Sequence, residues 1–130
     1  MPFLRITVRA PELASEQVRR LQRGATDLMV GVMRKPLAGV AVLVEHLAGE
    51  AGWAIAGAPV PVAAEVDAII GAGTNTAAEK ARFSAEMMAL LQAVLGPELR
   101  EETYIVLHEL PHDSYGRGGL TRAVRVAAAR

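Results

Sequence analysis

The sequence of 130 residues contains no cysteine. Disulfide bonds and thiolate metal sites are therefore excluded, and a reducing cytoplasm is the expected setting. The chain also lacks an excess of charge of either sign, because its formal net charge is zero at neutral pH. No basic field draws it to nucleic acid or to an anionic membrane surface, so we expect neither as a partner.

Long apolar runs are missing as well. The longest ones fall well short of the roughly 20 residues that span a bilayer, and Arg5 and Arg9 interrupt the only apolar stretch near the start. We therefore expect neither a transmembrane helix nor a secretory signal, which needs an unbroken apolar segment. A hydrophobic fraction of 52% with 22% charged residues is typical of a soluble domain with one core.

Two similar segments follow one another along the chain. The segment "PLAGVAVLVEHLAGEAGWAIAGA" begins at Pro36, and "PELREETYIVLHELPHDSYGRGG" begins at Pro97. Each runs from a proline through an apolar strand to an aromatic residue and small residues, so that Trp53 matches Tyr115. We predict a single domain over residues 1–130, made of repeat one (2–60), repeat two (61–122) and a tail (123–130).

The apolar pattern predicts the same elements in both repeats. Each has a strand, a helix with an apolar stripe and a second, nearly continuous apolar strand. Ser15 is the expected N-cap of the first helix, and Thr76 with Glu79 forms a capping box for the second. The expected strands cover 3–9, 40–45, 63–71 and 103–109, and the expected helices cover 14–34 and 77–95.

The order β-α-β-β-α-β predicts an α/β (α+β) fold. Its four strands form one sheet, and its two helices cover one face of that sheet. The other face is too apolar to meet water, so we expect it to pack against a partner.

Two short motifs resemble known binding sites but lack the context that those sites need. The run "HELPH" at 108–112 matches a zinc-binding pattern that requires a helix, whereas here it follows a strand and contains Pro111. The run "GAGTNT" lacks the third glycine of a dinucleotide fingerprint, although amides at the following helix start could hold a carboxylate. We therefore predict neither a metal nor an organic cofactor.

A combination of segments resembles the tautomerase superfamily, whose best-known member is 4-oxalocrotonate tautomerase. These segments are the opening "MPFLRITV", the unit around "KPLAGVAVLVEH" and the aromatic residue followed by small residues. The chain looks like the fused form with two units in tandem, related to malonate semialdehyde decarboxylase and cis-3-chloroacrylic acid dehalogenase. The resemblance covers residues 2 to about 122 and implies a tautomerase/MIF-like fold and a homotrimer.

The resemblance gives Pro2 the central role. Methionine aminopeptidase removes Met1 before a small residue such as proline, which leaves Pro2 with a secondary amine. In an apolar pocket the charged form of that amine is disfavoured, so its pKa falls and it takes up protons efficiently. The resemblance thus implies a keto–enol tautomerase, an isomerase of a small 2-keto acid or related carbonyl compound, with Pro2 as general base.

The arginines that bind the substrate carboxylate in the family are missing at the matching positions. Glu12 and Thr74 stand where the loop arginine is expected in the two repeats, which argues against a dicarboxylate substrate. We predict Arg9 or Arg117 as the carboxylate ligand instead, because a guanidinium fork matches a carboxylate. The candidate wall or hydrogen-bonding residues are Trp53, Tyr104 and Tyr115.

Two alternatives remain open. In a promiscuous hydratase or dehalogenase, a protonated Pro2 acts as the acid while Glu109 or Asp113 helps to activate water. If Met1 is retained, the Pro2 nitrogen is an amide, and the chain is a non-catalytic trimeric binding protein.

Overall fold

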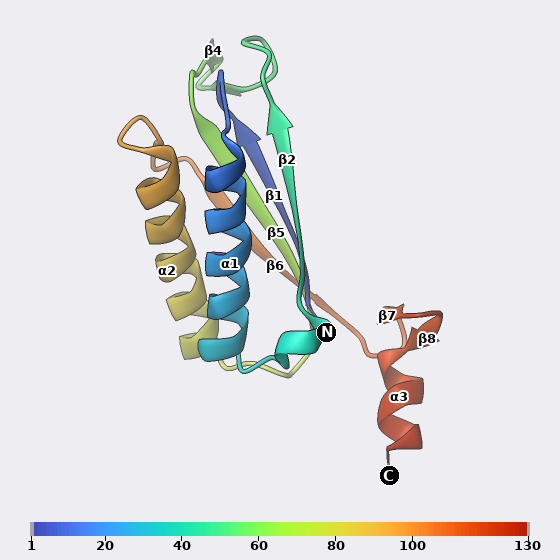
Figure 1. The fold of residues 1–130 in the computed structure, drawn as a ribbon. Coiled ribbons are helices and arrows are strands. Elements are labelled where there is room, and N and C mark those ends of the chain that lie inside the picture. Colours follow the sequence, from blue (N-terminus) through green and yellow to red (C-terminus); the bar gives the residue numbers. More distant parts are fainter. Residues whose placement is uncertain (1, 130) are drawn as a thin grey trace.

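The computed structural model describes residues 2–129. One sheet has the strand order β2-β1-β5-β6, and the helices α1 and α2 both cover one of its faces (Figure 1). The predicted α+β fold is therefore confirmed. Among the described residues, no helix is long and apolar enough to cross a membrane. The sheet and the two helices that cover it are formed by β1 (Phe3–Arg9), α1 (Ser15–Gly31), β2 (Ala41–Leu47), β5 (Ala63–Gly71), α2 (Ala77–Leu95) and β6 (Tyr104–Leu110).

The first strands of the two repeats, β1 and β5, run antiparallel at the centre of the sheet. Phe3 lies opposite Ile69, and Arg9 lies opposite Ala63. Each of these strands pairs in parallel with the second strand of its own repeat, β1 with β2 and β5 with β6. The start of each repeat therefore lies beside the end of the other repeat's first strand. We call these two regions the Pro2 end and the Arg9 end.

The core lies between the sheet and the two helices. Every second residue of β1 and β5 points to the helices, and one stripe of each helix points back, as the periods of the two structures require. Burial of these apolar side chains is the main driving force of the fold. The fully buried side chains include Leu4, Ile6, Val8, Val66, Leu21, Met29, Phe83, Met87 and Leu91.

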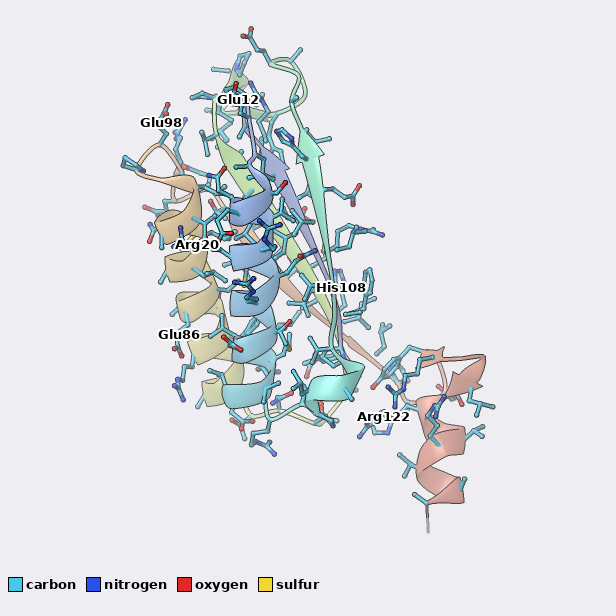
Figure 2. All side chains as sticks on the ribbon, in the orientation of Figure 1. Glu12, Arg20, Glu86, Glu98, His108 and Arg122 are labelled. Atoms are coloured by element: carbon cyan, nitrogen blue, oxygen red, sulfur yellow. The ribbon has the colours of Figure 1, made fainter. Side chains whose placement is uncertain are left out.

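The other face of the sheet is partly apolar and uncovered in a single chain. Phe3 and Leu43 are 37% and 39% exposed, and Tyr104 is 69% exposed. In Figure 2, His108 projects from this face, away from both helices. The side chains fit the expectation that this face packs against a partner.

Helix α1 begins and ends differently from the prediction. Ala14 is its N-cap and Ser15 its first residue, so the prediction that Ser15 caps the helix was wrong. The side chain of Gln17 supplies the reciprocal half of a capping box, because its Oε1 accepts a hydrogen bond from the Ala14 amide at 2.8 Å. The helix ends at Gly31, and the chain turns at Arg34, whose φ of 58° is left-handed.

Helix α2 begins and ends as predicted. The Glu79 amide donates to Thr76 Oγ1 at 3.1 Å, and the Thr76 amide donates to Glu79 Oε1 at 2.8 Å, which confirms the capping box. Gly96 ends the helix with a φ of 93°, a conformation that glycine adopts without strain.

A short hairpin follows the second strand of each repeat. The first is β3 (Ala54–Ile55) with β4 (Ala58–Pro59), and the second is β7 (Gly116–Arg117) with β8 (Leu120–Thr121). Both turn through two residues with positive φ, which is typical of type I′ turns. The second hairpin continues into α3 (Arg122–Ala128), and this C-terminal arm (116–128) projects from the Pro2 end of the sheet (Figure 1).

Candidate functional site

Pro2 is buried at the point where β1 begins. Its carbonyl oxygen accepts a hydrogen bond from the Ala41 amide at 3.1 Å. Ala41 is the first residue of β2, so the segment that leads into β2 lies at the same end of the sheet. This segment contains Lys35 and the 3₁₀ turn η1 (Leu37–Gly39). The Pro2 end is therefore built from β1, the α1–β2 connection and the end of β5.

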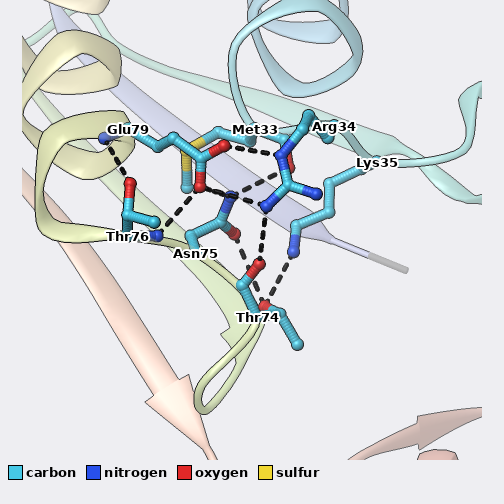
Figure 3. Close-up of polar contacts among 7 residues, drawn as sticks. All are labelled: Met33, Arg34, Lys35, Thr74, Asn75, Thr76 and Glu79. Atoms are coloured by element: carbon cyan, nitrogen blue, oxygen red, sulfur yellow. Dashed lines mark hydrogen bonds and ion pairs between the residues drawn. The ribbon is translucent and has the colours of Figure 1, made fainter.

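A polar network fixes the α1–β2 connection against the start of α2 (Figure 3). Arg34 forms an ion pair with Glu79 and donates from Nη2 to the Thr74 carbonyl at 3.3 Å. Lys35 Nζ donates to Thr74 Oγ1 at 2.8 Å, and that hydroxyl donates to the Gly71 carbonyl at 2.7 Å. The ammonium group of Lys35 is thereby tethered to the end of β5, where Pro2 also lies.

Gly71 makes room for two polar side chains at the Pro2 end. A Cβ atom at Gly71 would lie 2.5 Å from Tyr115 Oη and 3.1 Å from His112 Nε2. Any larger residue would displace the phenol of Tyr115. Within residues 2–129, His112 Nε2 is buried and has no hydrogen-bond partner. The Tyr115 phenol and the His112 imidazole therefore lie together beside the end of β5.

A cavity of about 460 Å³ opens at the same end, lined mostly by cationic side chains. Figure 2 shows Arg122 between the C-terminal arm and the body of the protein. The Nε atoms of Arg122 and Arg125 are both buried, and neither donates a hydrogen bond to a described residue. Apart from Arg34, none of these cations has an acidic partner in the part of the chain that the structure describes. The cationic residues of the cavity are Arg34, Lys35, Arg117, Arg122 and Arg125.

The environment of Lys35 shows how crowded these charges are. Burial lowers the pKa of the Lys35 ammonium, and the nearby positive charges of Arg122 and Arg34 lower it further. An anion in the cavity would offset the repulsion and accept the unused hydrogen bonds of the guanidinium groups. The arrangement therefore favours a ligand with at least one carboxylate or similar anionic group.

The structure divides the predicted site residues between the two ends of the sheet. Pro2, Tyr115 and Arg117 lie together at the Pro2 end. The remaining three belong to the Arg9 end and are separated from Pro2 within one chain by the length of β1. Arg9 ends β1, Trp53 precedes β3, and Tyr104 begins β6.

Glu109 and Asp113, the carboxylates proposed to activate water in the hydratase alternative, both interact with neighbouring side chains. Glu109 forms an ion pair with Lys80 at 3.2 Å, and Asp113 accepts a hydrogen bond from the Ser114 hydroxyl at 3.1 Å. That alternative stays a prediction. The alternative that depends on retention of Met1 concerns a residue outside the described part of the chain.

Sequence reasoning missed several residues of the cationic cavity. Lys35 and Arg34 form a basic pair immediately before Pro36, in the connection between a helix and a strand. Arg122 and Arg125 are spaced i, i+3, which places them on one face of a helix. Both signals are visible in the sequence, but only the position of the C-terminal arm shows that the two pairs face one cavity.

Solved structures with a similar fold include Pt0534, fused 4-OT proteins and a member of the cis-3-chloroacrylic acid dehalogenase family. Pt0534 inactivated by 2-oxo-3-pentynoate is 20% identical, with a TM-score of 0.83 over 95% of this chain and 98% of that chain. An asymmetric trimer of a fused 4-OT is 25% identical, with a TM-score of 0.78 over 93% of this chain and 98% of that chain. A member of the cis-3-chloroacrylic acid dehalogenase family is 20% identical, with a TM-score of 0.78 over 92% of this chain and 82% of that chain.

These likenesses are structural. No family model matches the chain, and no curated protein matches it in sequence. The similarity to fused 4-OT and to the dehalogenase family covers both repeats and confirms the resemblance drawn from the sequence at the level of the fold.

Proposed function

We propose that this chain, which has the fold of the tautomerase superfamily, is a tautomerase of a small anionic 2-keto acid. Its general base is the amine of Pro2 after removal of Met1. The observation that carries the proposal is the cationic cavity at the Pro2 end, whose lining includes Lys35 and Pro36 of the segment that leads into β2. Ala41, at the start of β2, donates its amide hydrogen bond to the Pro2 carbonyl.

The surroundings of Pro2 suit a base that works near neutral pH. Pro2 is buried, and several positive charges line the cavity at its end of the sheet. Burial and nearby cations both disfavour a protonated amine, so the nitrogen keeps its lone pair at a pH where an exposed amine is charged. A base of this kind takes up and returns protons efficiently.

The proposed reaction moves one proton between oxygen and carbon. The Pro2 nitrogen takes the proton of the enol hydroxyl, and the electron pair of the O–H bond forms the carbonyl group. The electrons of the C=C bond then take the proton from the prolyl ammonium at carbon 3, which restores the free amine. Lys35 and Arg122 hold the carboxylate, and the Tyr115 hydroxyl donates a hydrogen bond to the oxygen at carbon 2.

The assembly is part of the proposal. The fused 4-OT proteins of similar fold form trimers. We propose that this chain also forms a homotrimer, in which the exposed apolar side chains of the open sheet face are buried. Phe3, Leu43 and Tyr104 supply that apolar surface.

The test is hydrogen exchange at carbon 3 of 2-oxobutanoate in D₂O, followed by proton NMR. The reverse reaction removes a proton from this carbon, so an active enzyme exchanges it for deuterium. We expect Pro2→Ala to exchange about 100-fold more slowly, because an unconstrained alanine amine is neither held in place nor kept neutral to the same degree. Equal exchange rates for the two proteins would show that Pro2 is not the base.

A second test uses the reagent that inactivates Pt0534. In 2-oxo-3-pentynoate a triple bond is conjugated to a ketone, so a neutral amine adds to its far carbon. We expect one adduct per chain, located at Pro2 by peptide mass mapping. An adduct at lysine instead would argue against a free prolyl amine at the cavity.

A further inference from the structure

The Arg9 end of the sheet is the structural counterpart of the Pro2 end. Because β1 and β5 run antiparallel, Arg9 lies beside Ala63 at the start of repeat two, just as the end of β5 lies beside Pro2. A hairpin follows the second strand of each repeat, β3–β4 at the Arg9 end and β7–β8 at the Pro2 end. The internal repeat therefore produces two comparable positions for a ligand.

Arg9 is buried at this position without a partner. Its side chain is only 2% exposed, and no other charged or polar residue is buried to this degree among residues 2–129. Two of its nitrogens, Nε and Nη1, are buried and make no hydrogen bond to any described residue. A guanidinium group is always charged, and burying it unpaired is unfavourable, so the site calls for an anion.

Arg9 borders a small cavity lined by three prolines. The cavity measures about 240 Å³, which is room for a molecule of a few heavy atoms. Its walls include Pro11, Pro59 and Pro61, whose backbones carry no N–H group, so Arg9 is the main hydrogen-bond donor. Val60 adds an apolar surface for a short hydrocarbon chain.

Glu50 is the acidic residue at the rim of the cavity. It is exposed and forms no ion pair with Arg9 in the part of the chain that the structure describes. Its negative charge opposes a second negative charge on the ligand, so the site suits a monoanion rather than a dianion.

We infer that the Arg9 cavity binds a small monocarboxylate and does not transform it. The guanidinium group of Arg9 pairs with the carboxylate, and the proline and valine walls contact its short apolar chain. No prolyl amine is present here, because repeat two begins inside the chain and the nitrogens of Ala63 and Ala64 are amides. Within one chain this site lies at the opposite end of β1 from the proposed active site, and it does not depend on Pro2 chemistry.

The experiment is an NMR titration of the intact protein with propionate. A buried arginine gives an observable Nε–H signal, so Arg9 reports directly on binding. We expect propionate to shift this signal and the amides of Val60 and Val62, and we expect propionamide, which is neutral, to leave them unchanged. Arg9→Met should weaken propionate binding about tenfold or more, because the charged hydrogen bonds are lost.

Matched variants distinguish binding at Arg9 from binding elsewhere on the protein. Arg5→Met changes an arginine of the same strand that is exposed and pairs with Glu45 at 2.9 Å, so it should leave binding unchanged. Arg9→Lys keeps the positive charge and is the substitute variant if Arg9→Met does not fold. It should still bind propionate, but more weakly than the unaltered protein. Glu50→Gln should bind propionate at least as tightly as the unaltered protein.

Several outcomes would overturn the inference. Shifts confined to Lys35 and Arg122 would place the anion only at the Pro2 end. Binding that persists unchanged in Arg9→Met, or that appears only in Glu50→Gln, would show that Arg9 does not recruit an external carboxylate. Hydrogen exchange tests the Pro2 site, and the propionate titration tests the Arg9 cavity. Because the two measurements are independent, either proposal can fail without affecting the test of the other.

Discussion

Lys35 lies in the cavity at the Pro2 end, where its pKa depends on the neighbouring charges. Burial and the neighbouring guanidinium groups of Arg122 and Arg34 hold its pKa below the ordinary value. A bound carboxylate reverses this effect, since opposite charge stabilises the protonated ammonium. The same cations keep the Pro2 amine neutral in the proposed mechanism, so substrate binding and the state of the base are linked.

Replacing Arg122 with alanine is expected to weaken binding of the 2-keto acid more than it slows the chemical step. The Arg122 guanidinium lines the cavity, and its buried Nε has no partner among the described residues. Loss of one charge-assisted hydrogen bond costs about 1.5–3 kcal/mol, which raises KM about 10-fold to 100-fold.

Steady-state kinetics of exchange check this prediction for Arg122. Arg100→Ala is the matched control, because Arg100 is exposed and pairs only with Glu102 at 3.4 Å among its described neighbours. A KM for Arg122→Ala equal to that of the control would contradict the assignment of Arg122 as a carboxylate ligand.

Replacing Arg9 with methionine is expected to stabilise the protein when no anion is present. The substitution removes an unpaired buried charge from a chain position that is 2% exposed and keeps a side chain of similar length. Burying a charge without a partner is unfavourable, so its removal should raise the melting temperature by several degrees.

Thermal unfolding without and with propionate measures this gain. Propionate should raise the melting temperature of the unaltered protein and should not change that of Arg9→Met. The difference in melting temperature between the two proteins should therefore become smaller. A melting temperature of Arg9→Met below that of the unaltered protein under both conditions would show that Arg9 is paired in solution.

At the scale of elements, the start of α2 and the end of α1 hold the Pro2 end in shape. Glu79 caps α2 and at the same time pairs with Arg34 after α1, so one carboxylate joins two helices. The hydrogen bonds from Arg34 and from the Thr76 backbone hold the pKa of Glu79 well below its ordinary value of 4.5. The junction also positions Lys35 through Thr74.

Acidification is expected to weaken this junction. A carboxylate whose pKa is lowered in the folded protein contributes stability above its unfolded pKa, and this contribution disappears as the pH falls through the folded pKa. The melting temperature should therefore fall between about pH 5 and about pH 2, and Glu79→Gln should fall less over the same range. Identical pH dependence of the two proteins would contradict the role of Glu79.

The elements themselves could be predicted from the sequence, and much of the site could not. Alternation in β1 and the Thr76–Glu79 box are local signals, so the strand and the helix start were correct. The start of α1 was missed by one residue because the N-cap is Ala14, which has no side-chain acceptor, and only Gln17 binds its amide. The joint position of Lys35 and Arg122 depends on contacts between segments far apart in the sequence, which no local pattern contains.

At the scale of the whole molecule, the open face of the sheet is the surface that a single chain leaves uncovered. Apolar side chains of several strands share it with charged residues such as Arg5 and Asp67. In a trimer this surface would be buried, and the C-terminal arm that projects from the Pro2 end would be free to contact a second copy.

A charge on this face is expected to dissociate the proposed trimer. Leu43→Glu places a carboxylate on β2 at a position that is 39% exposed in one chain. Val30→Glu is the matched control, since Val30 is 38% exposed but lies on α1, on the other side of the molecule. Light scattering after size exclusion should give a monomer for Leu43→Glu and a trimer for the control. Trimers of both variants would show that the sheet face is not the interface.

The central claim, a neutral prolyl amine at the cationic cavity, is tested most directly by a pH titration of protein labelled with ¹⁵N-proline. The sequence has seven prolines, and only Pro2 can become an amine. The account predicts one proline ¹⁵N signal that titrates near neutral pH, while the others stay constant. The midpoint should rise in Lys35→Met, because a neighbouring positive charge is removed. If no proline nitrogen titrates, Pro2 is an amide and cannot be the base.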